Sequence, residues 1–315
     1  MKKPPHLKKG NTVGIISPAS PSFQPSDILR ATETLEALGY KVKLGPNVNR
    51  TKGFTAASAA DRAADFNAMF RDDTVDAVFS TQGGYGSAQM IRHIDFDAVG
   101  ACPKIFTGFS DITSLHLAIH RLAGVVTFHG PGAARFNSEA LTDYTEVQFF
   151  KALAEIDPLG GIPLANPKKW LNPVARGVGE GPLVGGNMTL VCSSLGTPFE
   201  IETDGRVLLL EEVDAEPWTV DHMLCHLQNA GKLNNLAGLI IGECVDVAPN
   251  RYEPGYYVDT SLEDVLNDYF ADAPYPVLYG LPLGHADDIA TLPLGVCARV
   301  DANEKTFTLL ESGVL

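Results

Sequence analysis

Cysteine is scarce in this 315-residue sequence, and its five cysteines are scattered without a C-x-x-C pair. A disulfide framework or a zinc knuckle needs cysteines at characteristic spacings, so the sequence predicts neither. Long hydrophobic runs are also absent, because no stretch approaches the roughly 20 apolar residues that span a membrane. The apolar run behind the N-terminal lysines is too short for a secretory signal, so we expect a cytoplasmic protein without membrane contact.

Positive charge is the second deficit. The chain has 24 Lys and Arg against 38 Asp and Glu, which gives a formal net charge of -14. Nucleic-acid binding depends on clustered Lys and Arg, and the chain has no such cluster, so we expect no nucleic-acid partner.

A hydrophobic content of 45% with 20% charged residues is ordinary for a globular protein. The length favours two domains, each with its own core.

The N-terminal half alternates short apolar strands with amphipathic helices. Strands are expected at Thr12–Ile16, at residues 40–44 and at residues 75–80, with helical periodicity between them. Parallel strands need a crossover connection, which is commonly a helix. The pattern therefore predicts an α/β fold, with residues 1–155 forming a doubly wound, flavodoxin- or Rossmann-like parallel sheet.

A stretch rich in Pro, Gly and Asn follows this domain. Residues 156–180 have the composition of a linker between domains. Beyond the linker, strands and helices alternate again, with an apolar strand within residues 205–213 and a helix after Trp218. We expect residues 181–315 to form a second, smaller α/β domain.

A serine stands at a strand-to-helix turn in KIFTGFSDITSLHLAIH, residues 104–120. Ser110 follows a β-prone run that ends at Gly108, and the residues after it have helical apolar spacing. Unpaired N–H groups at a helix start can stabilise the oxyanion that forms when such a serine attacks a carbonyl. A serine here is also a common helix cap, and the G-x-S-x-G pattern of α/β-hydrolases is missing. This stretch alone therefore leaves both interpretations open.

A glycine-rich loop, TQGGYGS at residues 81–87, follows the preceding strand. Glycines at the carboxyl end of a strand let backbone N–H groups approach a ligand closely. The phosphate-binding patterns G-x-G-x-x-G and G-x-x-x-x-G-K-[ST] are absent, so an oxyanion is the better candidate ligand. The candidate oxyanion donors are the N–H groups of Asp111 and of Gly83 or Gly84. A tight turn without chemistry is the alternative.

Residues with acid–base chemistry stand in the second half. Glu211 and Glu212 end a fully apolar strand, where a carboxylate must be paired or face a cleft, and side-chain alternation places only one of them in a site. His285, in PLGHADD, has no core pattern around it. Ser110, His285 and Glu211 together offer a nucleophile, a general base and an orienting carboxylate. His129, at another strand end, is a weaker candidate base.

A metal site has little support in the sequence. His222 and His226 are one helical turn apart and would share a helix face. The H-E-x-x-H pattern and a third ligand are missing, so two solvated or packed histidines are the simpler interpretation. We expect no metal ion and no cofactor.

The chain also resembles the LD-carboxypeptidase (muramoyltetrapeptide carboxypeptidase) family. From about residue 10 to residue 300 the family's motifs occur in order: VGIISPAS, QGGYG, GFSDIT, TFHGP, GGNMTLVCSSLGTP, LLLEEVDAEPWTVDHML, GLIIGE and PLGHADDIATLPLG. The resemblance implies a two-domain serine peptidase whose Ser-Glu-His triad matches Ser110, Glu211 and His285. It also implies release of a terminal D-amino acid, typically D-alanine, from a murein tetrapeptide in cytoplasmic cell-wall recycling, by a homodimer that uses no metal.

Two positions depart from the family pattern. The family's glycine loop commonly begins with arginine, where this chain has Gln82, and arginine is also common where this chain has His222. The loss of two cations affects the expected substrate and leaves the triad intact. Gln82, Tyr85 and Trp218 are the candidate substrate contacts.

Two other functions stay open from the sequence. A relative of the same fold, the microcin C self-immunity peptidase, cleaves aminoacyl-nucleotide analogues with a similar triad, and Trp218 can stack on a base in such a substrate. Doubly wound sheets also occur in small-molecule binding proteins without catalysis. Turnover that depends on Ser110 separates a hydrolase from a binding protein.

Overall fold

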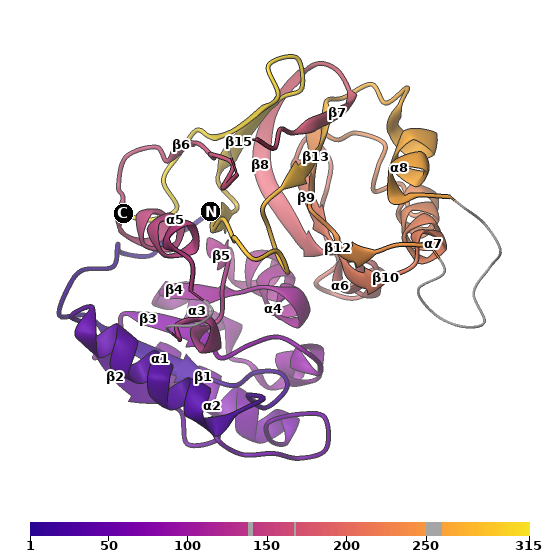
Figure 1. Ribbon diagram of the computed structural model, residues 1–315. Helices are drawn as coiled ribbons and strands as arrows, with labels where there is room; N and C mark the ends of the chain where they lie inside the picture. The colour runs from indigo at the N-terminus through magenta and orange to yellow at the C-terminus, as the bar shows by residue number, and fades with distance from the viewer. Residues whose placement is uncertain (138–140, 167, 250–259) are drawn as a thin grey trace.

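The structure is a computed structural model that describes residues 1–137, 141–166, 168–249 and 260–315. Two β-sheets form its framework (Figure 1). The first sheet belongs mainly to the indigo and magenta N-terminal half, and the second lies in the red, orange and yellow portion of the ribbon. Within the described residues, no helix combines the length and the apolar character that crossing a membrane requires.

The first sheet has six strands in the order β14-β5-β4-β3-β1-β2. Their bounds are β1 (Thr12–Ile16), β2 (Lys41–Leu44), β3 (Ala77–Ser80), β4 (Ile105–Gly108), β5 (Thr127–His129) and β14 (Leu292–Leu294). Strands β1 to β5 are parallel, and β14 pairs antiparallel with β5. The order of the parallel strands is the flavodoxin-like one, in which ligands bind outside the carboxyl ends of the strands. The predicted fold class is confirmed.

Helices cover both faces of the first sheet. Side chains alternate along a strand, so Val13 and Ile15 of β1 pack with α1 and α5, whereas Ile16 packs with α2, α3 and α4. The helices are α1 (Pro25–Ala37), α2 (Ala59–Arg71), α3 (Phe96–Ala101), α4 (Thr113–Ala118) and α5 (Asp143–Ala154). Shorter helical turns are η1 (Ser87–His93), η2 (Ser110–Ile112), η3 (Ile119–Ala123) and η4 (Ala133–Arg135).

The second sheet has eight strands in the order β6-β16-β15-β8-β9-β11-β13-β7. Their bounds are β6 (Gly160–Gly161), β7 (Asn172–Ala175), β8 (Val178–Asn187), β9 (Val207–Glu211), β11 (Gly238–Gly242), β13 (Val277–Leu281), β15 (Cys297–Asp301) and β16 (Thr306–Leu309). The neighbours β8, β9, β11 and β13 are parallel. A separate pair joins β10 (Val213–Ala215) and β12 (Val245–Val247).

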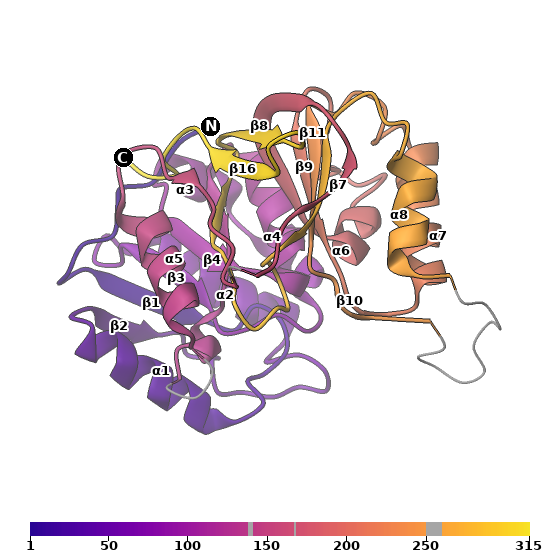
Figure 2. The same ribbon diagram turned by 45° about the horizontal axis from the view of Figure 1, so that its top comes forward.

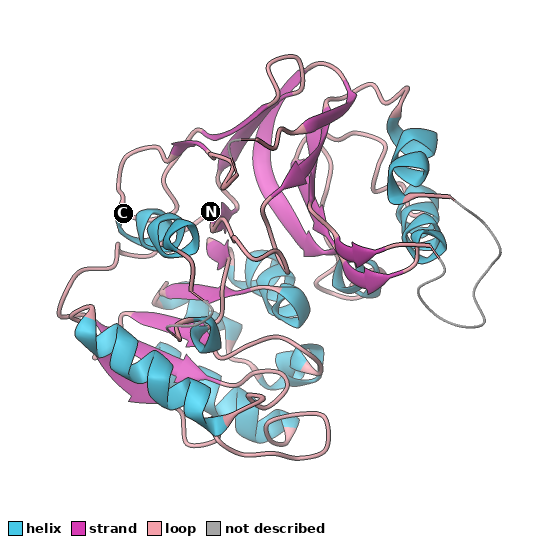
Figure 3. Cartoon of the chain, viewed as in Figure 1, coloured by secondary structure: helices cyan, strands magenta, loops and turns pink. Residues whose placement is uncertain are grey.

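Three helices cover the outer face of the second sheet (Figures 2 and 3). They are α6 (Met188–Ser193), α7 (Pro217–Asn229) and α8 (Leu262–Phe270). Leu208 and Leu210 of β9 face these helices, and Val207 and Leu209 face the opposite way. Both faces of β9 are therefore buried, as its uninterrupted apolar sequence predicts.

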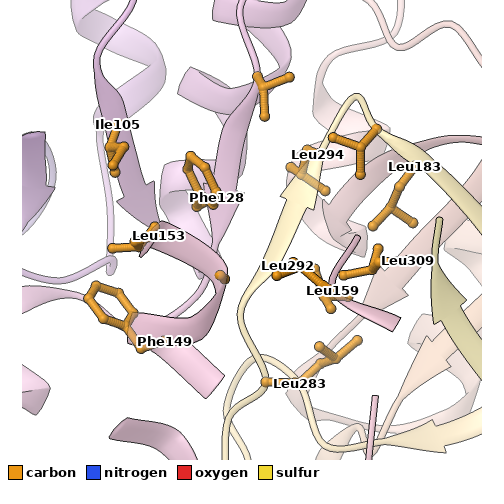
Figure 4. Packing of buried hydrophobic residues seen from close by; sticks show 14 of the residues in the cluster. Ile105, Phe128, Phe149, Leu153, Leu159, Leu183, Leu283, Leu292, Leu294 and Leu309 are labelled. Carbon is orange, nitrogen blue, oxygen red and sulfur yellow. The ribbon is translucent and has the colours of Figure 1, made fainter. Parts of the chain in front are cut away.

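One apolar cluster joins the two sheets (Figure 4). It contains Ile105 and Phe128 of the first sheet, Leu292 and Leu294 of β14, and Leu183 of β8. Domains of a chain move freely relative to one another unless their interface is large and hydrophobic. This shared core therefore holds the loops of the two sheets at fixed positions relative to one another.

Two features cross the predicted domain limits. Residues 156–180, the predicted linker, contain β6 and β7, which pair at the two edges of the second sheet. Strand β14 comes from the predicted C-terminal domain, residues 181–315, but it pairs with β5 of the predicted N-terminal domain, residues 1–155. The linker thus contributes two edge strands to the second sheet, and the C-terminal half contributes one edge strand to the first. The limits of the domains themselves remain a prediction.

Candidate active site

Ser110 lies directly beyond the carboxyl end of β4, after Phe109. Its backbone is left-handed, with a φ of 61°, which is uncommon for a residue with a side chain and costs free energy. The residue at the cap position of η2 is Phe109, and no side chain caps this turn. The helix-cap alternative for Ser110 is therefore wrong, and its hydroxyl is directed to another partner.

That partner is His285, in the connection that follows β13. Its Nε2 lies 3.2 Å from Ser110 Oγ, and its Nδ1 lies 2.9 Å from Glu211 Oε2. Because a carboxylate only accepts hydrogen bonds, the proton belongs on Nδ1, which leaves Nε2 free to accept from the hydroxyl. The ring also meets Phe109 edge to face, with 5.1 Å between ring centroids. The structure thus joins the three predicted triad residues in one hydrogen-bonded row.

Glu211 is the last residue of β9 and is only 1% exposed. Its second oxygen, Oε1, has no hydrogen-bond partner among the described residues. Gly284 lies against this carboxylate with a φ of 64°, and a Cβ at that position would be 2.1 Å from Glu211 Oε2. A residue larger than glycine would therefore displace the carboxylate. Gly284 was not among the residues predicted from the sequence, although it directly precedes the candidate base.

Glu212 points to the other side of the strand, where both of its carboxylate oxygens accept hydrogen bonds. Its Oε1 accepts hydrogen bonds from Asn187 Nδ2 at 3.1 Å and from the Val213 N–H at 3.0 Å. Its Oε2 accepts from the N–H and the hydroxyl of Thr189, at 3.0 and 2.7 Å. Only Glu211 therefore faces His285, as the alternation along the strand predicts.

The glycine loop packs against the Ser110 turn. A Cβ on Gly83 would lie 2.8 Å from Ser110 Cβ and 3.2 Å from the Asp111 nitrogen, so only a glycine permits this approach. The carboxylate of Asp111 accepts a hydrogen bond from the Ser87 N–H at 2.7 Å. The candidate oxyanion donors, Asp111, Gly83 and Gly84, thus belong to two segments in direct contact.

Ser20 is a site residue that was not predicted from the sequence. Its N–H donates to the Gly83 carbonyl at 3.3 Å, and its hydroxyl accepts from the Tyr85 N–H at 3.1 Å. The same hydroxyl donates to the Phe54 carbonyl at 2.8 Å. Ser20 therefore fixes the glycine loop to the loop after β1. The available signal was its place in VGIISPAS, one of the motifs shared with the family.

The candidate substrate contacts belong to two separate segments of the chain. Gln82 Nε2 donates to the Pro21 carbonyl at 2.7 Å, and the exposed ring of Tyr85 meets Phe54 edge to face. Both residues stand in the loop beside Ser110. Trp218 lies at the start of α7, half exposed, and its Nε1 donates to Glu216 Oε2 at 3.0 Å.

The other histidines have different surroundings. His129 is fully buried at the end of β5, and burial lowers its pKa to about 3. Neither of its ring nitrogens has a hydrogen-bond partner among the described residues, so His285 rather than His129 is bonded to Ser110. His222 and His226 are exposed on α7. Across the described stretches of the chain, no three His, Cys, Asp or Glu side chains are grouped to hold a metal ion.

Comparisons with known proteins agree on one family. Residues 13–130 match the LD-carboxypeptidase N-terminal domain, and residues 180–300 match the LD-carboxypeptidase C-terminal domain. The chain is 39% identical to a probable murein peptide carboxypeptidase of Bacillus subtilis, over 99% of this chain and 95% of the relative. It is 30% identical to a murein tetrapeptide carboxypeptidase of Pseudomonas aeruginosa, over 92% and 93%.

The fold is also similar to that of a related protein of known structure. A solved structure of the microcin C7 self-immunity protein MccF in its wild-type apo state superposes with a TM-score of 0.85 at 25% identity, covering 100% of both chains. The triad-like geometry, the two matched domains and these relatives lead to one conclusion. The chain belongs to the LD-carboxypeptidase family and is a serine-type carboxypeptidase.

Proposed function

We propose that this enzyme hydrolyses the peptide bond between an L-centre and a terminal D-amino acid, typically D-alanine, in a murein tetrapeptide. In this proposal Ser110 is the nucleophile, His285 the general base and Glu211 the orienting carboxylate. The observation that carries it is the position of the His285 ring, 3.2 Å from the Ser110 hydroxyl on one side and 2.9 Å from Glu211 on the other. A serine hydroxyl attacks only when a base takes its proton, and this ring is placed to do so.

The first half of the reaction acylates the serine. As Ser110 Oγ attacks the carbonyl carbon, its proton passes to His285 Nε2, and the imidazolium is stabilised by Glu211. The carbonyl oxygen becomes an oxyanion, which the N–H groups of Asp111 and of Gly83 or Gly84 stabilise. The C–N bond then breaks, the amine of the D-residue takes the proton from Nε2, and the acyl group stays on Ser110 as an ester.

The second half restores the enzyme. A water molecule gives a proton to His285 Nε2 and attacks the ester carbonyl, and the same donors stabilise the second oxyanion. The ester C–O bond breaks, Ser110 Oγ regains the proton from Nε2, and the shortened peptide leaves as a carboxylic acid that gives its proton to solvent. No other protein group needs to change its protonation state.

The substrate assignment is supported by the relatives. The Bacillus and Pseudomonas proteins are named murein peptide and murein tetrapeptide carboxypeptidases. The alternative is a peptidase of the microcin C self-immunity type, favoured by the TM-score of 0.85 with MccF. MccF of Escherichia coli is 26% identical to this chain, against 39% for the Bacillus protein, so we favour the murein peptide. Membership of a peptidase family also favours a hydrolase over the binding protein without catalysis.

A substrate panel tests this proposal. Purified enzyme is incubated with a tetrapeptide that ends in an L,D-bond, with the matched L,L-peptide and with an aminoacyl-sulfamoyl nucleoside, and Ser110→Ala serves as the blank. We expect release of the terminal D-residue from the L,D-peptide alone. Preferred cleavage of the nucleoside analogue would transfer the assignment to the alternative, and cleavage of the L,L-peptide at an equal rate would contradict the L,D specificity.

The homodimer and the cytoplasmic location implied by the family belong to the same proposal. Murein fragments that re-enter the cell would meet the enzyme in the cytoplasm. Light scattering of the purified protein would give twice the mass of one 33.7 kDa chain if it is a dimer. Fractionation of cells that express the tagged protein checks the location.

A further inference from the structure

Arg62 is a buried cation beneath the loops of the active site. It belongs to α2 and is only 1% exposed. Its Nε donates to the Ala57 carbonyl at 3.1 Å, and its Nη1 donates to the carbonyls of Pro18 and Gly86, the latter at 2.8 Å. Its Nη2 donates to Gln89 Oε1 at 3.0 Å. A buried charge is costly unless it is hydrogen-bonded, and here the planar guanidinium meets four acceptors.

Three of these acceptors belong to loops at the edge where Ser110 lies. Pro18 follows β1, Ala57 precedes α2, and Gly86 ends the glycine loop after β3. One rigid side chain therefore ties three loops together. Lysine carries a single point charge and lacks the fork of donors that does this.

The link from Arg62 to the nucleophile is short. Gly86, which accepts from Arg62, is followed by Ser87, whose N–H donates to the Asp111 carboxylate at 2.7 Å. Burial lowers the pKa of Arg62, and the negative charge of Asp111 opposes that shift. At its other end, the glycine loop is fixed by the hydrogen bond from Ser20 to Gly83. The loop is thus held at both ends against the Ser110 turn.

We propose that Arg62 is a positioning residue for the oxyanion donors. By holding the Gly86 end of the loop, it fixes the N–H groups of Gly83 and Gly84 relative to Ser110 Oγ. It touches neither the substrate nor the triad, and its effect passes through the loop. The inference rests on the proposed acyl-enzyme mechanism, because only an oxyanion needs these donors.

Lys104 provides a matched control. It is buried at 4% exposure and also donates to backbone carbonyls, those of Met69 at 2.9 Å and of Asp72. It precedes β4, so it lies at the opposite end of the strand from Ser110. Lys104→Met and Arg62→Met each remove one buried cation from the same region of the protein, and only Arg62→Met releases the glycine loop.

The test compares kcat and KM of these two variants at a temperature where circular dichroism shows both to be folded. We expect Arg62→Met to lose roughly 100-fold in kcat, the loss typical of one missing oxyanion donor, with little change in KM. Affinity for a peptide boronic acid, which mimics the tetrahedral intermediate, should fall with kcat, while affinity for the product peptide should not. Lys104→Met should lose thermal stability and keep its kcat. In Arg62→Ala, added guanidinium should restore some of the lost kcat.

A folded Arg62→Met with the kcat of the wild type would overturn the proposal, and so would an equal loss of kcat in Lys104→Met. If Arg62→Met does not fold, Arg62→Lys decides, because lysine keeps the charge and cannot reach all three loops. Wild-type kcat in Arg62→Lys contradicts the proposal, and a reduced kcat with unchanged KM supports it. A fluorophosphonate should label Ser110 in the wild-type enzyme, and this result separates the two proposals. Absence of the label would refute the proposed triad itself, and not the role of Arg62 alone.

Discussion

The carboxyl edges of the two sheets contribute different chemistry to the active site. The first sheet brings Ser110 and a group of backbone N–H donors, held by hydrogen bonds between loops. The second brings Glu211 on a buried strand end and His285 in the connection after β13. In the proposed mechanism, the first edge offers the nucleophile and the hydrogen-bond donors, and the second offers the base and the carboxylate that orients it. Because that mechanism needs both edges, we expect activity to depend on the apolar core that the two sheets share.

The largest effect is expected from removing the reactive atom on the first edge. Ser110→Ala should lower kcat by roughly 10⁶-fold, because the remaining donors can stabilise an oxyanion only if one forms. Steady-state hydrolysis of the L,D-peptide measures this loss. Ser193→Ala, which changes an exposed serine of α6, should behave as the wild type. Substantial turnover by Ser110→Ala would show that the nucleophile does not lie on this edge.

Variants of the two adjacent glutamates, Glu211 and Glu212, test the second edge. Glu211→Gln should lower kcat by up to about 10⁴-fold, because an amide cannot keep His285 in the required tautomer. Glu212→Gln should keep most of its kcat and lose about 1–3 kcal/mol of stability, because its hydrogen bonds to Asn187 and Thr189 are weakened. Peptide hydrolysis and thermal unfolding of both variants measure the contrast. The reverse pattern would show that the other face of the strand serves the site.

A smaller loss is expected when the carboxylate is moved rather than removed. Gly284→Ala would place a Cβ 2.1 Å from Glu211 Oε2, and a displacement of about 1 Å can cost roughly 100-fold in kcat. Gly280→Ala is the matched control, because Gly280 also has a positive φ, of 103°, and its nearest neighbour is 4.0 Å from the added Cβ. Both variants should lose stability, and Gly284→Ala alone should lose kcat. Equal kcat values would show that the site tolerates movement of Glu211.

The smallest effect is expected in the pH dependence of stability, through the buried His129 at the end of β5. The pKa of His129 is lowered by burial from 6.5 to about 3 in the folded protein. The unfolded chain therefore binds a proton below pH 6.5 that the folded chain does not, so this contribution to stability is present above pH 6.5 and is lost as the pH falls toward 3. At pH 5 the loss amounts to about 2 kcal/mol.

His129→Leu removes this titration together with two unpaired nitrogens. Its Tm at pH 7 should equal or exceed that of the wild type, and its Tm should fall less between pH 7 and pH 5. Thermal unfolding followed by circular dichroism at both pH values measures the difference. An equal fall in both proteins would show that His129 does not carry the acid sensitivity.

Local patterns were sufficient to predict much of this architecture. The parallel strands of the first sheet and the apolar strand ending in Glu211 were recognisable because burial imposes a continuous apolar sequence. Ser110 and His285 were recognisable because each stands outside a core pattern, next to glycine or at a turn. The family motifs then indicated that these distant residues meet.

Features that depend on tertiary contacts were not predictable. The three residues of β14 do not indicate which sheet they join, and pairing with β5 depends on the core that forms around them. The left-handed backbone of Ser110 goes against the preference of serine, so only the surrounding structure can impose it. The sequence does not reveal the role of Arg62, because its acceptors include backbone carbonyls from three loops that are separate in sequence.

The most direct test of the account is to find which residue becomes covalently modified. Wild-type enzyme is treated with a fluorophosphonate, and peptide mass spectrometry locates the adduct. We expect one adduct, on Ser110, which forms much more slowly in His285→Ala and is prevented by excess L,D-peptide. Efficient peptide hydrolysis by an enzyme that carries no adduct, or carries it on another residue, would contradict this expectation.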